Sequence, residues 1–162
     1  LEVSLPEKQY KEFYFKATDA TCILENHNID TIITETVNGT IEFKNIKTNM
    51  INSNCINGNI ISHSDVLSQQ YHFKSVNGNI DAVFSVFPTS LFTYTGNGNI
   101  TLTLPENDGF SIDKSKLKTT KNLNSSFSLK DANNKKIYKN GKTALDIVCM
   151  NGTITLKKLE NI

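Results

Sequence analysis

Apolar and polar residues alternate along this chain in a pattern that returns about every 20 residues. Each copy centres on an Asn-Gly pair, which follows a stretch of alternating side chains and precedes an isoleucine two residues after the glycine. The glycines of the first four copies lie 19, 20 and 20 residues apart. A fixed period of this size indicates a repeat architecture. The copies occupy residues 37–41, 56–60, 76–80, 96–100 and 150–154.

The residues before each glycine predict a strand that buries one face. Positions seven and three before the glycine point to the same side of such a strand, because side chains alternate across it. The first of these positions is large and the second is small, and an isoleucine opens the strand after the corner. Large side chains facing small ones fill a core without voids. The large residues are Ile32, Ile51, Tyr71, Leu91 and Leu145, and the small ones are Thr36, Cys55, Ser75, Thr95 and Cys149.

Two architectures accommodate such a corner. In a meander of hairpins, Asn-Gly closes two-residue type I′ turns; in a β-solenoid, each repeat is one coil and the corners stack. The invariant asparagine favours the solenoid, because a hairpin would also accept Asp or Gly. Asparagines stacked about 4.8 Å apart can also form a hydrogen-bonded ladder. We therefore expect an all-β, single-stranded β-helix-like solenoid. The predicted corner ladder comprises Asn38, Asn57, Asn77, Asn97 and Asn151.

The chain has the length of one ordinary domain, and we expect residues 1–162 to form a single solenoid. The period breaks once, after the fourth copy, and the last copy then resumes it. The expected parts are N-terminal strands with a degenerate coil (1–29), regular coils (30–104), a lysine-rich antiparallel excursion or cap (105–143) and a final repeat (144–162).

Three finer expectations follow from the same pattern. The stretch 26–29 resembles the motif without its glycine, so we place the degenerate first corner there. The residue two positions before each glycine is usually apolar, so we expect the corner to turn it inward. Ile46, Val66 and Val86 align from coil to coil and are expected to mark a second corner, on the far side of each turn.

Composition adds little about partners. The net charge is +1, which gives no global argument for binding nucleic acid. No run of about 18 apolar residues is present, so the sequence predicts no transmembrane segment. Because the chain opens on Leu1, we expect that an upstream signal peptide or membrane anchor has been removed. The three cysteines cannot form a complete disulfide framework, and we interpret Cys55 and Cys149 as small buried residues.

Residue types that carry chemistry are present but scattered. His27, His63 and His72 lack the density of ligands that a zinc site needs. No Gly-x-Ser-x-Gly motif of a hydrolase occurs. Glu42 and Asp81 take the position three after the glycine, but on alternate coils. We therefore predict no catalytic residue, no metal site and no cofactor.

One segment has a marked charge. Between Asp113 and Lys142, nine lysines stand against two aspartates, a net charge of +7. The simplest interpretation is a solvated cap that keeps the end of the solenoid soluble. The alternative is contact with an anionic envelope polymer or lipid headgroups. The candidate contact residues are Lys114, Lys116, Lys118, Lys135, Lys136 and Lys139.

These features resemble the bacterial toastrack family of adhesin-like domains. The resemblance is carried by the repeated [Val/Ile]-Asn-Gly-[Asn/Thr]-Ile motif, by Leu104-Pro105 before a phenylalanine strand, and by a final copy after a long excursion. It covers nearly the whole chain. It implies a right-handed, single-stranded β-helix that is extracytoplasmic or associated with the cell envelope, and it implies no active-site residue.

The expected function is therefore a non-catalytic cell-surface or envelope-associated scaffold or adhesin-like domain that binds an envelope polymer or protein. A carbohydrate-active β-helix enzyme is the alternative from a different class. A signalling partner that senses envelope stress is a third hypothesis, which only the family resemblance suggests.

Overall fold

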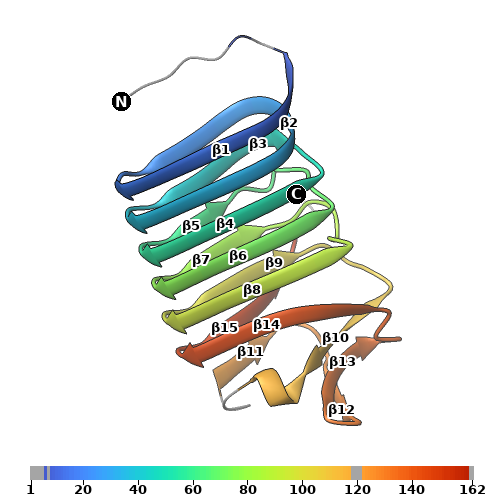
Figure 1. Ribbon diagram of the computed structural model, residues 1–162. Helices are drawn as coiled ribbons and strands as arrows, with labels where there is room; N and C mark the ends of the chain where they lie inside the picture. Colours follow the sequence, from blue (N-terminus) through green and yellow to red (C-terminus); the bar gives the residue numbers. More distant parts are fainter. Residues whose placement is uncertain (1–5, 7, 118–121, 161–162) are drawn as a thin grey trace.

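The computed structural model describes residues 6, 8–117 and 122–160, and in this part the chain is almost entirely β-strand. The expected strand over 1–6 and the candidate Lys118 lie largely or wholly outside the described residues. The strands form two layers of a flattened solenoid, drawn in front and behind in Figure 1. The front layer contains β1 (Gln9–Asp19), the second half of β2 (Cys22–Asn38), β4 (Met50–Asn57), β6 (Gln70–Asn77), β8 (Ser90–Asn97), β14 (Thr143–Asn151) and β10 (Gly109–Asp113). The rear layer contains the first half of β2, β3 (Ile41–Lys47), β5 (Ile60–Ser62), β7 (Ile80–Val83), β9 (Ile100–Leu104), β15 (Ile154–Lys158) and β11 (Leu123–Ser125).

The predicted solenoid is confirmed, and the hairpin meander is not what forms. Front strands run from right to left in Figure 1, rear strands return from left to right, and the chain descends with each turn, so the winding is right-handed. Connections between parallel strands take this hand in nearly all folds. The long β2 joins the layers, because its first half pairs with β3 and its second half with β4.

Equivalent positions of successive coils stand directly above one another. Ile51 aligns with Ile32 and with Tyr71, and all pairings between the coils are parallel. The last copy rejoins this stack as expected, since β14 pairs with β8 and β15 with β9. The excursion between them is partly antiparallel: β10 pairs with β13 (Lys135–Lys139), and β13 forms a hairpin with β12 (Lys130–Ala132). A short 3-10 helix (Lys114–Lys116) follows β10.

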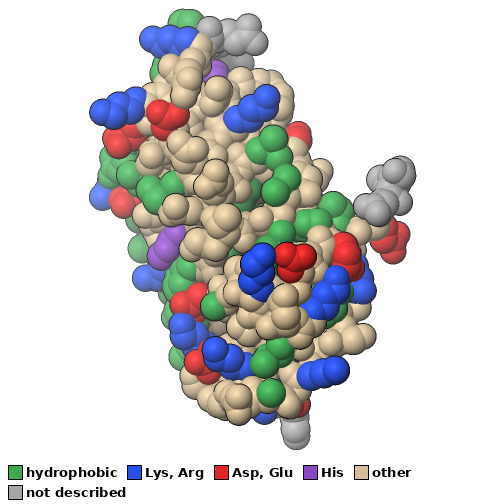
Figure 2. Space-filling model, turned by 90° about the vertical axis from the view of Figure 1, so that its right-hand side faces the viewer, with side chains coloured by type: hydrophobic (Ala, Val, Ile, Leu, Met, Phe, Trp, Pro, Cys, Tyr) green, Lys and Arg blue, Asp and Glu red, His purple; other side chains and the backbone are tan. Residues whose placement is uncertain are grey.

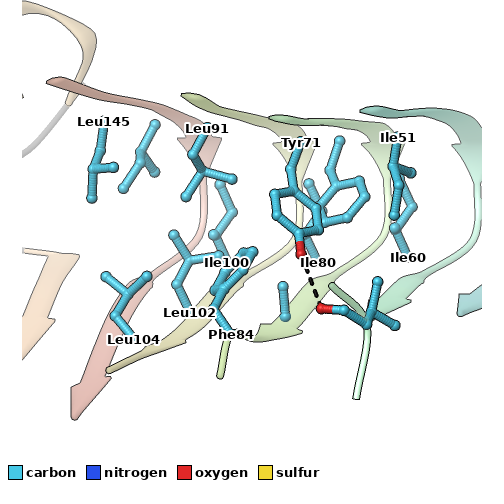
Figure 3. Packing of buried hydrophobic residues seen from close by; sticks show 14 of the residues in the cluster. Ile51, Ile60, Tyr71, Ile80, Phe84, Leu91, Ile100, Leu102, Leu104 and Leu145 are labelled. Carbon is cyan, nitrogen blue, oxygen red and sulfur yellow. Dashed lines mark hydrogen bonds between the residues drawn. The ribbon is translucent and has the colours of Figure 1, made fainter. Parts of the chain in front are cut away.

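The core lies between the layers and consists of stacked apolar columns (Figure 3). The isoleucine after each corner is buried in every coil, with at most 4% of its surface exposed. Tyr71 brings a polar group into this core, and its hydroxyl donates to the Val66 carbonyl over 3.1 Å. Its ring packs edge-on against Phe84, with the ring centroids 4.9 Å apart. The isoleucines are Ile41, Ile60, Ile80, Ile100 and Ile154.

The corners depend on a close approach between neighbouring coils. A Cβ atom on Gly58 would lie 1.9 Å from the Gly39 carbonyl oxygen, and the same contact recurs at Gly78, Gly98 and Gly152. Real Cβ atoms do not come this close to another heavy atom, so only glycine fits. The side chain three residues before each corner glycine donates a hydrogen bond to the backbone carbonyl of the corner glycine in the coil above. The donors are Ser75 (2.9 Å), Thr95 (2.8 Å), Cys55 (3.3 Å) and Cys149 (3.4 Å), and Thr36 donates to Ala20 (3.2 Å).

The predicted asparagine ladder is present in the structure. Each side-chain amide donates to the side-chain oxygen of the coil above, over 2.7–2.9 Å. At the top, Asn38 donates to the Asp19 carboxylate over 2.5 Å. The ladder side chains are exposed at the surface of the corner. A second ladder was not predicted: the side chains of Asn59, Asn79 and Asn99 accept from the backbone N–H of the residue below.

The first corner was placed wrongly. It lies at residues 19–22, where Asp19 aligns with Asn38 and Cys22 with Ile41. Ala20 can stand in the glycine position because, in the described part of the chain, no coil lies above it to press a carbonyl against its Cβ. Asn26 instead marks the far corner, with a φ of 60°, and it accepts a hydrogen bond from Asn45 over 2.8 Å.

Two further expectations were wrong. The residue two before the glycine faces solvent, since Ile56 is 45% and Val76 36% exposed. The alternation of β4 and β6 simply continues through these positions, and the change of side occurs only at the Asn-Gly pair. Ile46 and Val66 align as expected, since Lys47 pairs with Leu67, and both are buried, but Val86 is 61% exposed. In this coil the inward position falls one residue later in the chain, so Phe87 packs against the core in place of Val86. Its ring stacks on that of Phe110, with the ring centroids 6.2 Å apart.

The glycine-carbonyl hydrogen bond predicts a clear contrast at Cys55. Cys55→Ser should leave the free energy of unfolding within about 1 kcal/mol of wild type, because serine makes this bond in the next coil. Cys55→Ala should cost about 1–3 kcal/mol, because the Gly39 carbonyl loses its donor inside the corner. Denaturant titration of the two variants measures both values. Equal stability of the Cys55→Ser and Cys55→Ala proteins would contradict a donor role.

Candidate functional site

The lysine-rich cap is the first candidate, and most of its lysines are paired with carboxylates. Lys114 and Lys136 both contact Asp131, at 3.3 and 3.0 Å, and Lys116 contacts Asp146 at 2.6 Å. Lys139 contacts Glu106 at 2.5 Å. Figure 2 accordingly shows lysines and acidic residues interspersed over the lower part of the molecule, with no continuous basic patch on this side.

Several acidic partners come from outside the segment that suggested a positive patch. Glu106 and Asp108 precede the segment, and Asp146 follows it in β14. Lys135 lines a small hollow of about 180 Å³ that also contains Asp113 and Asp146. The cap therefore presents paired charges, and contact with an anionic polymer through Lys114, Lys116, Lys118, Lys135, Lys136 and Lys139 remains a prediction.

Glu106 is the centre of the strongest electrostatic cluster in the cap. Its carboxylate accepts from the Tyr138 hydroxyl over 2.6 Å and contacts Lys139, with Lys158 at 3.8 Å. Hydrogen bonds from Lys139 and then Tyr138 lower the pKa of Glu106 to about 2. Tyr138 is buried and its ring packs at an angle against Phe110 and edge-on against Phe127, so this cluster fastens the hairpin to the end of the solenoid.

The polar residues of the rear layer form a smaller cluster. Glu42 accepts from His63 over 2.7 Å and contacts Lys44 at 3.0 Å. Hydrogen bonds from these two side chains, His63 first, lower the pKa of Glu42. The register places Ile61 between Glu42 and Asp81, as the sequence predicted. In the described part of the chain, no three His, Cys, Asp or Glu side chains gather as they would around a metal ion.

A surface hollow lies beside the far corner of the first coils. Its volume is about 420 Å³ and it is widely open to solvent. It contains two lysines and a histidine with amide side chains, which could bind an anion but do not supply an acid–base pair. Its lining residues are Lys8, Gln9, Asn26, His27, Asn28, Asn45 and Lys47.

The second candidate is the outer surface of the front layer, here called the front face. It consists of the outward side chains of β1, β2, β4, β6, β8 and β14. One column lies beside the corner ladder and is apolar; its partly exposed members are Val37, Ile56, Val76 and Met150, and the buried Gly96 interrupts it between Val76 and Met150. The columns beside it hold Tyr14, His72, Phe92 and Tyr94.

Neighbouring coils order these aromatic side chains. The rings of His72 and Phe92 stack with their centroids 4.3 Å apart, and the Lys74 ammonium lies 5.7 Å from the centre of the Tyr94 ring. Burial lowers the pKa of His72, and the Lys74 charge adds to this effect, so the neutral ring is favoured. The result is a flat surface on which apolar and aromatic groups lie among charged side chains, two of which, Lys16 and Glu35, form an ion pair at 3.0 Å. Sequence reasoning missed this surface because it placed the residues of the apolar column inside the corner.

Comparison of the chain with protein-family models, with curated proteins and with solved structures gives no match. The resemblance to the toastrack family therefore stays an expectation that rests on the sequence motifs alone. Among the described residues, no helix is long and apolar enough to cross a membrane.

The Glu106 cluster predicts a pH dependence. The folded state favours the carboxylate of Glu106, so its contribution to stability is fully present above its ordinary pKa of 4.5 and is lost as the pH falls toward about 2. Glu106→Gln should therefore flatten the fall in the free energy of unfolding between these pH values. Urea titrations across this range measure the slope, with Glu25→Gln on an exposed rear strand as the control. An unchanged slope in Glu106→Gln would contradict the role of the cluster.

Proposed function

We propose that this protein is a non-catalytic scaffold or adhesin-like domain of the cell envelope, which binds its partner through the front face. The exposed apolar column beside the corner ladder carries this proposal. Ile56 and Val76 are neighbours on successive coils and both are more than one-third exposed. Contiguous apolar surface of this kind is typical of an interaction site.

The solenoid supports a binding role because it holds the front face rigid. Every coil is tied to the next by backbone pairing, by the asparagine ladder and by the hydrogen bond to the glycine carbonyl. A preorganised surface loses little conformational entropy on binding. Repeat proteins use such extended faces to bind large partners.

The cap has a separate role in this proposal. The bottom of the solenoid ends in the β12–β13 hairpin, which the Glu106 cluster fastens in place. Lysines and carboxylates on this hairpin keep the end of the stack solvated and discourage pairing with other chains. The localisation in the envelope rests on the resemblance stated above.

A β-helix enzyme that cleaves polysaccharide would bring two or three carboxylates together on adjacent coils. Here Glu42 is held by His63 and Lys44, and Ile61 separates it from Asp81. This alternative therefore has no specific observation in its favour.

Binding to isolated cell envelopes tests the proposal. Wild-type protein should co-sediment with envelopes, and the double variant Ile56→Asp/Val76→Asp should bind at least about tenfold more weakly, because it places two charges at the centre of the apolar column. The matched control is Thr101→Asp/Thr103→Asp on the rear layer, which should bind as wild type does. Protease treatment of the envelopes separates a protein partner from a polymer.

Equal binding of both double variants, or no binding by wild type, would contradict the proposal. Release of soluble glycan by wild type, abolished in Glu42→Gln or Asp81→Asn, would favour the enzyme instead. Circular dichroism melting of each variant confirms that a loss of binding does not come from unfolding.

A further inference from the structure

The two ends of the solenoid differ. The lower end is covered by β10 and by the β12–β13 hairpin, whereas at the upper end β1 pairs only with β2 within the described residues (Figure 1). β1 is 11 residues long and contains no proline. A long open edge strand of this kind readily pairs with another strand.

The core layer under β1 is incomplete. Phe13, Phe15 and Ala17 point inward but are only half-buried. Their partners in the next coil, Ile32, Thr34 and Thr36, are buried almost completely. Another strand on the free edge would therefore bury two phenylalanines further.

The backbone of β1 offers a regular set of hydrogen-bonding groups at this edge. In each corner the asparagine carbonyl accepts from the coil above, as Asn38 accepts from Ala20. The N–H and C=O groups of a strand alternate between its two sides. Since β1 pairs with β2 without a bulge and Asp19 aligns with Asn38, alternate residues direct these groups to the free edge. They include Phe13, Phe15 and Ala17.

We propose that two copies of this chain form a two-fold dimer through antiparallel pairing of their β1 strands, centred on Tyr14. In this register Phe13 lies opposite the partner's Phe15 and exchanges backbone hydrogen bonds with it. Glu12 lies opposite the partner's Lys16, and the symmetry repeats this ion pair. The outward residues then form the closer, non-hydrogen-bonded pairs, in which cross-strand contacts are strongest.

Charge and size select this register over its neighbours. A shift by two residues in one direction places Lys11 opposite a phenylalanine and leaves Glu12 opposite tyrosine. A shift in the other direction places Glu12 opposite Thr18 and removes the contact with Lys16. In the proposed register both Phe13 and Phe15 meet a phenylalanine of the partner, and both Glu12–Lys16 pairs form. Lys16 also contacts Glu35 of its own copy, on the neighbouring β2, at 3.0 Å, so in the dimer its ammonium would lie between two carboxylates.

The dimer would join the two front faces into one continuous surface, because a two-fold axis normal to the layer keeps both on the same side. Two linked faces would bind a repetitive partner more tightly than one, through avidity. The dimer itself does not depend on the proposed function, since it rests on β1 alone.

Disulfide trapping tests the register. Tyr14→Cys should form a disulfide-linked dimer under mild oxidation, because residues directly opposite in a non-hydrogen-bonded pair have suitable Cα distances. The native cysteines are buried and should not interfere. Lys16→Cys alone is the control. The introduced cysteines of the two protomers would be four residues apart along the paired strands, about 13 Å, and should not cross-link. An equal mixture of Glu12→Cys and Lys16→Cys should give the mixed dimer.

Charge reversal gives an independent measurement. Sedimentation equilibrium of wild type should show a monomer–dimer equilibrium, and Glu12→Lys should weaken it at least about tenfold by opposing lysines at both pairs. The double variant Glu12→Lys/Lys16→Glu should restore dimerisation. Lys74→Glu, in the middle of the front face, should have no effect. A wild-type monomer at every concentration, or a dimer with no Tyr14→Cys cross-link and no charge dependence, would overturn the proposal.

Discussion

The close stacking of glycine on glycine at the Asn-Gly corner is the constraint on which the rest of this structure depends. The carbonyl oxygen of each corner glycine lies where a Cβ of the next corner residue would be. Two corners can therefore pack this closely only if the residue in the lower coil is glycine. This approach fixes the register, and the register places equivalent positions of the repeat above one another. Both asparagine ladders, the isoleucine column and the small donors that satisfy the glycine carbonyls then follow. A single steric condition, repeated about every 20 residues, therefore organises local hydrogen bonding and global packing together.

The same condition determines what the surface can do. Stacked coils bury their inward columns and leave outward columns just as regular, so apolar residues beside the ladder gather into a stripe. A stacked fold also has two ends, and each must be closed or paired. The chain closes one end with a hairpin fastened by Glu106, Tyr138 and Lys139. At the other end β1 stays open within the described residues, which is why we infer pairing with a second copy.

Much of the fold was predictable from the sequence because the repeat carries it. The period, the inward positions and the ladder asparagines all follow from residue types at fixed distances from glycine. The first corner was missed because Asp19 and Ala20 do not look like Asn-Gly; only the absence of a coil above, within the described residues, makes Ala20 acceptable. The exposure of Ile56 was missed because an apolar residue at a corner suggests burial, whereas the strand alternation decides its side. The pairing of the cap lysines with Glu106, Asp108 and Asp146 could not be predicted, because those partners come from segments that only the fold brings together.

The stability of glycine variants at the corner tests this account most directly. Gly58→Ala should lower the free energy of unfolding by more than about 3 kcal/mol, because the methyl group would displace the coil above and break the ladders. Ala20→Gly, at the matching position of the first coil, should change it by no more than about 1 kcal/mol. Denaturant unfolding of both variants gives the comparison. A Gly58→Ala protein as stable as wild type would contradict the claim that glycine stacking sets the register.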